Sequence, residues 1–319
     1  MKRICAALMA LLLLCACSPT EQTSSQLNIV ATTYPTYLAV RAVTDGVEGV
    51  SVSRLDTGSV SCLHDYTLTV NDMKKLSRAD IIVINGAGME RFLADALSGL
   101  DADVIDCSVG IDLLPASGHH DHDHAHHHGD DADHYDSHYW MATWNMTTMV
   151  HNMLYDLLPR LDTQSYSLAL ANTEQALALI KDCELECLQM ARQAGDDAAL
   201  ITFHDGFAYF AHVFELPLLR AIEEEAGSEA SAREIVEVSR LVQEHRLPVI
   251  FTEVNGSDAT ARAISRETGC AVATLSMIMD GPASAPDGRN PITLYTDAIY
   301  GNLHTIMQYF SPAGGDPTP

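Results

Sequence analysis

The stretch Asp162–Gln193 contains neither glycine nor proline, and its apolar residues recur at roughly helical spacing. A helix of this length would extend about 50 Å at 1.5 Å per residue. Pro159 marks a break before the stretch and Gly195 ends it. A rigid rod of this kind divides the chain into two halves, so we predict a connecting helix over residues 161–194.

Short apolar runs alternate with amphipathic stretches before this helix. The expected strands are residues 27–33, 50–55, 80–85 and 103–106, and the expected helices are 38–44, 72–77, 90–100 and 141–158. Such alternation is typical of a parallel sheet with helices on its faces. The first lobe is therefore predicted to span residues 27–160.

The same alternation returns after the connecting helix. The expected strands are residues 199–203, 249–252 and 271–275, and the expected helices are 207–214, 233–245, 258–268 and 293–310. We predict an α/β fold with two Rossmann-like βα lobes, each built on a parallel sheet, joined by the long helix. The second lobe would span residues 195–311, and a tail over 312–319 is expected to be disordered.

A histidine-rich tract occupies residues 117–135. Its histidines, interleaved with aspartates, are His119, His120, His122, His124, His126, His127, His128 and His134. Neutral imidazole is the commonest ligand for zinc, and the tract has almost no apolar residue to bury. We interpret it as a solvated auxiliary loop that collects metal ions, with a purification tag or a plain spacer as the alternatives.

The first 16 residues combine Lys2 and Arg3 with a short apolar run, which is typical of a signal peptide and too short to span a bilayer. Small residues precede Cys17, as in a bacterial lipobox. That resemblance implies cleavage before Cys17 and lipid attachment to its thiol, with an ordinary secretory signal as the alternative. Residues 17–26 would then be a lipidated cysteine and a flexible tether. The predicted location is the extracytoplasmic face of the bacterial cell membrane.

The formal net charge is −25, so attraction to nucleic acid or to an anionic membrane surface is not expected. An odd number of cysteines follows Cys17, which excludes a complete disulfide framework. Cys183 and Cys187 lie four apart on the predicted helix and share one face. They are interpreted as small buried residues, with a strained disulfide or a soft metal site as alternatives.

Three candidate ligands follow predicted strands: His64, His204 and Asp280. Ligands of open α/β sheets collect beyond the carboxyl ends of the strands, which is where these residues are expected. His138 can join them because apolar residues return around it after the histidine-rich tract. Three imidazoles and one carboxylate are a plausible tetrahedral zinc set.

These residues carry a resemblance to a known family. Four segments resemble, in this order, motifs of the zinc- and manganese-binding lipoproteins of bacterial ABC importers: His64-Asp65-Tyr66, Ala79–Glu90, Asp136–Trp140 and Phe203–Phe210. This is the cluster A-I group of solute-binding proteins, and the similarity is greatest to its ZnuA-type members. It covers residues 27–310, although Ser137 stands where the family usually has proline.

The resemblance implies metal bound in a cleft between two lobes by His64, His138, His204 and Asp280, with Glu253 beside the site or structural. It further implies that a monomer captures Zn²⁺ with high affinity and delivers it to an ABC permease driven by its ATPase. Imidazole-rich ligation favours zinc, with manganese as the alternative.

Two other functions are compatible with parts of the sequence. A three-histidine site with an open position could be a zinc-dependent hydrolase, but the chain has no His-Glu-x-x-His or Gly-x-Ser-x-Gly motif. We therefore predict no catalytic residues. A surface adhesin of the same family is the other alternative.

Overall fold

The computed structural model describes residues 26–57, 63, 66–116, 135–195, 197–222, 231–254 and 256–311. Several predicted features lie outside the described residues: the signal peptide, Cys17, the tether up to residue 25, His64, the histidines of the histidine-rich loop and the tail over 312–319. Within the described part of the chain, no helix is both long enough and apolar enough to cross a membrane.

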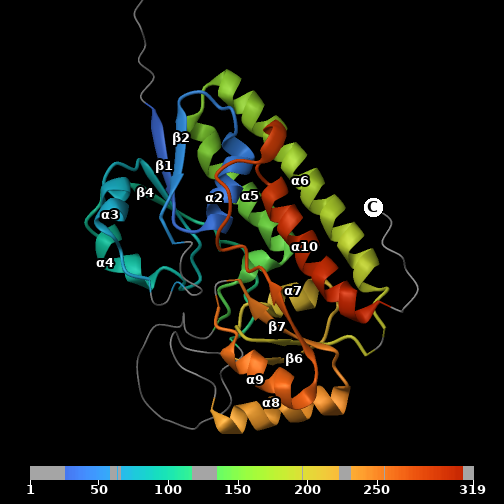
Figure 1. Cartoon of the computed structure of the whole chain (residues 1–319). Helices are drawn as coiled ribbons and strands as arrows, with labels where there is room; N and C mark the ends of the chain where they lie inside the picture. The colour runs from blue at the N-terminus through green and yellow to red at the C-terminus, as the bar shows by residue number, and fades with distance from the viewer. Residues whose placement is uncertain are drawn as a thin grey trace, which may run out of the picture.

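The first lobe is built on a four-stranded parallel sheet in the order β2-β1-β3-β4. Its strands are β1 (Leu27–Ala31), β2 (Val50–Arg54), β3 (Ile81–Ile84) and β4 (Asp103–Asp106). Its helices are α2 (Tyr34–Thr44), α3 (Val70–Leu76), α4 (Ala94–Leu97) and α5 (Thr143–Leu157). Helices α3 and α4 cover one face of the sheet, and α2 and α5 cover the other (Figure 1).

The second lobe repeats this plan with the order β6-β5-β7-β8, again all parallel. Its strands are β5 (Leu200–Thr202), β6 (Leu218–Ala221), β7 (Val249–Glu253) and β8 (Ala271–Leu275). Its helices are α7 (Ala208–Val213), α8 (Ala232–His245), α9 (Ala259–Thr268) and α10 (Thr293–Phe310). The predicted α/β class with two parallel-sheet lobes is confirmed.

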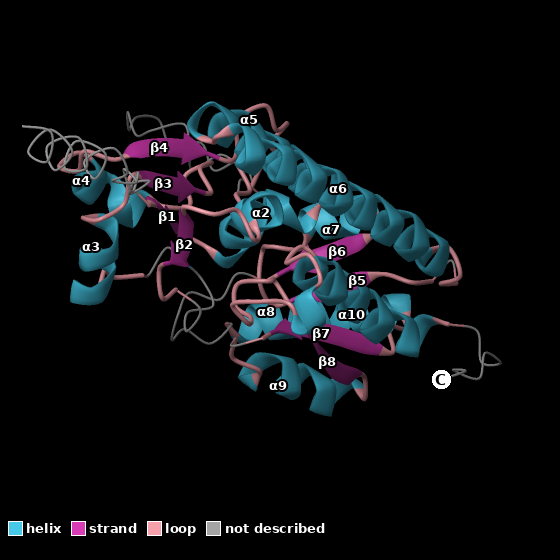
Figure 2. Ribbon diagram, turned by 90° about the horizontal axis from the view of Figure 1, so that it is seen from above, coloured by secondary structure: helices cyan, strands magenta, loops and turns pink. Residues whose placement is uncertain are grey.

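Helix α6 (Thr163–Ala191) is the predicted connecting helix. It begins at Asp162, whose carboxylate accepts a hydrogen bond from the backbone N–H of Ser165 at 2.8 Å. The helix packs against α2 and α5 of the first lobe and against α10, the last helix of the second lobe. Figure 2 shows it running along both halves of the molecule.

One apolar core extends from the first sheet, through the helices between the lobes, to the second sheet. Alternate residues of the strands enter it: Ile29 and Ala31 point into this core, whereas Val30 points to the outer face under α3 and α4. A smaller core around Ile201 and Ile250 lies under α8 and α9. The two lobes therefore share their largest buried region.

Candidate metal site

His138 lies in a short segment that leaves the histidine-rich tract and enters the core. The segment is fixed at its start by a backbone bridge between Pro115 and Tyr135 and by a 2.8 Å hydrogen bond from the Asp136 N–H to the Leu114 carbonyl. Trp140, which follows His138, is fully buried, and its indole N–H donates to the Met277 carbonyl at 2.9 Å. The sequence therefore places a polar imidazole on a well-anchored turn.

Asp136 fixes the orientation of the His138 ring. Its Oδ1 lies 2.8 Å from His138 Nδ1 and also accepts the backbone N–H of His138 at 2.8 Å. A carboxylate at Nδ1 keeps the proton on that nitrogen and leaves the lone pair on Nε2 available for a metal ion. The Asp-x-His spacing could have indicated this arrangement, since Asp side chains commonly bond backbone N–H groups two residues later.

His204 follows strand β5 at the carboxyl end of the second sheet, as predicted. Gly206 makes room beside it: a Cβ at this position would lie 2.6 Å from Met277 Cε and 3.0 Å from His204 Cδ2. Glu253, at the end of the adjacent strand β7, lies with Oε1 3.6 Å from His204 Nδ1. Burial raises the pKa of Glu253 to about 8, so its carboxyl group is largely protonated at neutral pH.

The two imidazoles meet between the lobes. Their Nε2 atoms are 3.4 Å apart, with ring centroids at 5.1 Å and ring planes at 89°. Both side chains are buried, and the His138 ring packs against the ring of Trp140 with centroids 5.2 Å apart. This separation fits a hydrogen bond between the two rings, and it also fits two nitrogen ligands of a single cation.

Asp280 is placed differently. Its Oδ1 accepts hydrogen bonds from Arg54 Nη2 at 2.7 Å and from the Gly281 backbone N–H at 2.7 Å, and its side chain is half exposed. Among the residues that the structure describes, no three His, Cys, Asp or Glu side chains gather as a metal-binding group. The structure thus brings His138 and His204 together, and it pairs Asp280 with an arginine that sequence reasoning did not identify.

His64 itself is outside the described residues, but its neighbours are informative. Leu63 is fully buried in the shared core, together with Trp140 and Phe207 from the segments that carry the other two histidines. Tyr66 is also buried there, and its hydroxyl donates to Asp72 at 2.7 Å. The residues on both sides of His64 and Asp65 are therefore anchored in the same core as the histidine pair.

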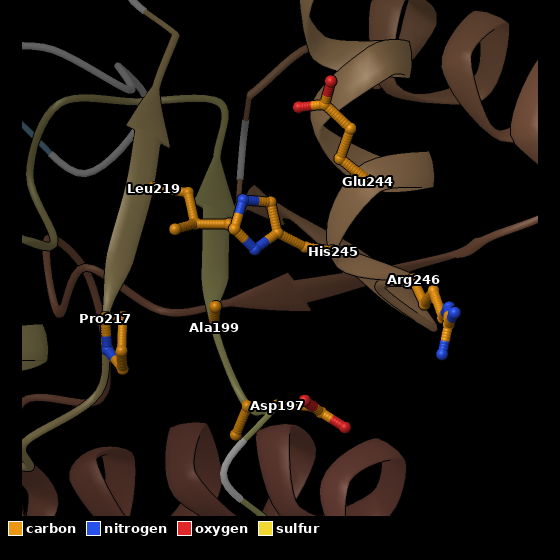
Figure 3. A pocket seen from close by; sticks show the side chains of 8 residues that line it. Asp197, Ala199, Pro217, Leu219, Glu244, His245 and Arg246 are labelled. Carbon is orange, nitrogen blue, oxygen red and sulfur yellow. The ribbon is translucent and has the colours of Figure 1, made fainter.

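A cavity of about 360 Å³ lies elsewhere in the second lobe (Figure 3). Its lining includes Ala199 and Pro217, just before β5 and β6, together with His245 at the end of α8. These positions are at the amino ends of the strands, whereas His204 follows a carboxyl end. The cavity contains none of the predicted ligands and is not part of the histidine site.

The paired cysteines of α6 are buried, as predicted, and lie on the face toward α10. The Cys183 and Cys187 sulfurs are 3.9 Å apart, both are free thiols, and Cys183 contacts the Thr296 carbonyl at 3.7 Å. The hydrogen bond with the Cys187 thiol, together with burial, raises the pKa of Cys183 far above its ordinary value.

Two parallel-sheet lobes, a long connecting helix and facing imidazoles between the lobes define the class of metal solute-binding proteins. A family model described as "zinc-uptake complex component A periplasmic" matches residues 29–309. The chain belongs to this family.

Individual relatives agree with that assignment. The zinc-binding lipoprotein AdcA of Streptococcus pneumoniae serotype 4 is 28% identical over 281 residues, which are 84% of this chain and 54% of AdcA. The chain thus spans about half the length of the first curated relatives it matches. The manganese-binding lipoprotein MntA of Halalkalibacterium halodurans is 24% identical over 213 residues, covering 66% of each chain.

The fold has also been seen in solved structures. A zinc-bound ZnuA deletion mutant superposes with a TM-score of 0.73 at 22% identity, covering 90% of this chain and 99% of the other. At this level of identity the similarity establishes the shared two-lobed fold.

Proposed function

We propose that this protein captures Zn²⁺ outside the cytoplasmic membrane and delivers it to an ABC permease for import. The observation that carries the proposal is the 3.4 Å separation of His138 Nε2 and His204 Nε2. Two nitrogen ligands of a tetrahedral zinc ion, each about 2.05 Å from the metal, lie about 3.3 Å from one another. The histidine pair therefore has the spacing of one edge of a zinc tetrahedron.

In this proposal, His64 and Asp280 complete the ligand set. The anchored neighbours of His64 support its place beside the pair, and Asp280 belongs to the loop that follows β8 at the carboxyl end of the second sheet. The Asp136 carboxylate at His138 Nδ1 strengthens the imidazole as a ligand, as carboxylate partners do in zinc sites. Zinc is cargo here, so the site has to release it as well as bind it.

We infer the identity of the metal ion and of the partner proteins from the family and from the names of its relatives. Imidazole ligands favour zinc, and the relative AdcA is named as a zinc-binding lipoprotein. The relative MntA is named as manganese-binding, so manganese is the second candidate. The proposed partners are an ABC permease and its ATPase. In this proposal the protein is a monomer that a lipid on Cys17 anchors to the membrane. The histidine-rich loop collects metal ions.

The test is a zinc titration of protein that lacks Gly118–Asp133, which removes all the loop histidines except His134. We expect one tight site to remain, and His138→Ala or His204→Ala to weaken it at least about a hundredfold, which corresponds to about 2.7 kcal/mol. His151→Ala is the matched control, because this histidine is exposed on α5. No tight site in the loop-deleted protein, or full affinity in both histidine variants, would refute the proposal.

A further inference from the structure

The segment that carries His138 is held by both lobes. The Asp136 carbonyl accepts a hydrogen bond from the Tyr209 hydroxyl at 2.9 Å, and the Trp140 indole donates to the Met277 carbonyl at 2.9 Å. Both partners belong to the second lobe. The residues directly before and after His138 are bonded to the first lobe instead.

Two of the bonds to the first lobe are made by Asn85, which follows strand β3 and is fully buried. Its side-chain Nδ2 donates to the Ser137 carbonyl at 3.1 Å, and its own carbonyl accepts a hydrogen bond from the Tyr139 hydroxyl. One residue thus bonds both chain neighbours of His138. Through Asn85, the end of β3 fixes this imidazole relative to His204, which lies at the end of β5.

Glu90 in turn holds Asn85. Its carboxyl group is buried, and Oε1 accepts the backbone N–H of Asn85 at 2.6 Å and the Thr32 hydroxyl at 2.6 Å. The other oxygen, Oε2, accepts the backbone N–H of Gly86 at 3.0 Å. A single carboxyl group therefore fixes the turn that places Asn85 beside the segment of His138.

We propose that Asn85 is a positioning residue for His138, and that Glu90 serves the metal site by holding Asn85. This inference rests on the proposed function, of which it uses only the pairing of His138 with His204. Their Nε2 atoms have to lie about 3.3 Å apart to bind one tetrahedral zinc ion, and they are 3.4 Å apart. A displacement of about 0.5 Å distorts such a site, so a contact that fixes His138 before the metal arrives raises the affinity.

Asn85→Ala tests the positioning role in the full chain. Zinc is titrated in competition with a chelator, so that only the tightest site is measured. The substitution removes the donor to Ser137, and we expect zinc to bind about tenfold more weakly, which corresponds to about 1.4 kcal/mol. Glu90→Gln keeps one acceptor oxygen for three donors and should weaken zinc binding about threefold.

Two double variants separate the positioning of His138 from a general effect on the fold. In the His138→Ala background there is no imidazole to position, so Asn85→Ala should cause no further loss of zinc affinity. In the His204→Ala background His138 still binds the metal, so a loss of about tenfold should remain. A purely structural role of Asn85 would give equal losses in both backgrounds.

Asn290→Ala is the matched control. Asn290 is also a buried asparagine, and its Nδ2 donates to the carbonyls of Ala42 on α2 and Asn172 on α6, at 3.4 and 3.2 Å. This variant should lose stability in denaturant titrations, as Asn85→Ala does, but keep its zinc affinity within about twofold. If Asn85→Ala is too unstable to purify, Tyr139→Phe removes only the hydroxyl that donates to the Asn85 carbonyl and should weaken zinc binding about threefold.

Unchanged zinc affinity in Asn85→Ala, an equal loss in Asn290→Ala, or a loss that persists in the His138→Ala background would overturn the role of Asn85. Unchanged affinity in Glu90→Gln would overturn the role of Glu90. Failure of the proposed function would be distinct, because His138→Ala and His204→Ala would then leave zinc binding intact whatever residue stands at position 85.

Discussion

The two histidines that face one another are supported in different ways. His138 has its carboxylate partner two residues away, and Asp136 binds both the ring and the backbone at 2.8 Å. His204 has its partner on a neighbouring strand, where Glu253 lies 3.6 Å from the ring nitrogen. The first imidazole is oriented by its own turn, whereas the second depends on the packing of the second lobe.

Because the carboxylate partners of the two histidines are attached differently, substitutions at Asp136 and at Glu253 should affect different properties of the protein. The carboxylate that orients the His138 ring belongs to its own turn, and that turn is bonded to Asn85 and to Tyr209, whose hydroxyl donates to the Asp136 carbonyl at 2.9 Å. The Glu253 contact exists only when β5 and β7 are paired, which joins Thr202 to Phe251. We therefore expect changes at Asp136 to affect metal binding, and changes at Glu253 to affect mainly the stability of the fold.

The largest expected effect is on the pH dependence of stability. Burial raises the pKa of Glu253 from 4.5 to about 8, so the folded protein holds a proton that the unfolded chain releases above about pH 4.5. Unfolding then releases a proton across this interval, and the contribution of Glu253 to the free energy of unfolding falls as pH rises from about 5 to 8, by about 2–4 kcal/mol.

Glu253→Gln should remove this contribution, so its free energy of unfolding should fall less between pH 5 and 8. Denaturant titrations of chelator-treated protein measure the slope. Glu90, which is buried in the first lobe with a pKa raised to about 7, contributes a smaller decrease that should persist in the variant. Identical slopes for the wild type and the variant would show that Glu253 is ionised in the folded protein.

The next effect in size is on zinc affinity at the first histidine. Asp136→Asn keeps an oxygen for the two hydrogen bonds but removes the negative charge, and we expect zinc to bind about tenfold to a hundredfold more weakly. The amide nitrogen takes the place of Asp136 Oδ2, which has no hydrogen-bond partner among the described residues, so no existing hydrogen bond is lost there. Chelator competition at pH 7 measures the loss, and unchanged affinity would mean that the carboxylate does not tune His138.

The smallest effect is expected at the second histidine. Glu253→Gln replaces a largely neutral carboxyl group at pH 7 with a neutral amide of similar shape, so zinc affinity should change less than about threefold. The same competition assay applies. A loss as large as that of Asp136→Asn would remove the contrast between the two histidines, because both carboxylates would then act on the metal.

Much of the fold follows from sequence because the strands are apolar and the helices are separated by glycine and proline. Strand β6 was not predicted: Leu218–Ala221 is short, only half-buried and includes Arg220, so it lacks both an apolar run and an alternating pattern. The helix expected over residues 90–100 was wrong in extent. A short 3₁₀ turn at Arg91–Leu93 precedes α4, which covers only Ala94–Leu97.

The candidate site was predictable to the extent that its residues follow strands or anchored turns. His138 and His204 are close together because their positions are set by β5 and by the segment after residue 135. The pairing of Asp280 with Arg54 could not be predicted, because it joins residues 226 positions apart through the contact of two lobes. His64 and the loop histidines stay predictions.

The shared core limits how loaded and empty protein can differ. The Tyr295 hydroxyl from α10 donates to the Trp140 carbonyl at 2.8 Å, and the Trp140 indole donates to the Met277 carbonyl, so the first and second lobes are tied through buried, fully packed residues. A wide hinge motion would expose this apolar interior to water at considerable cost. A ligand that binds between the lobes is therefore expected to change local side-chain positions and not the angle between the lobes.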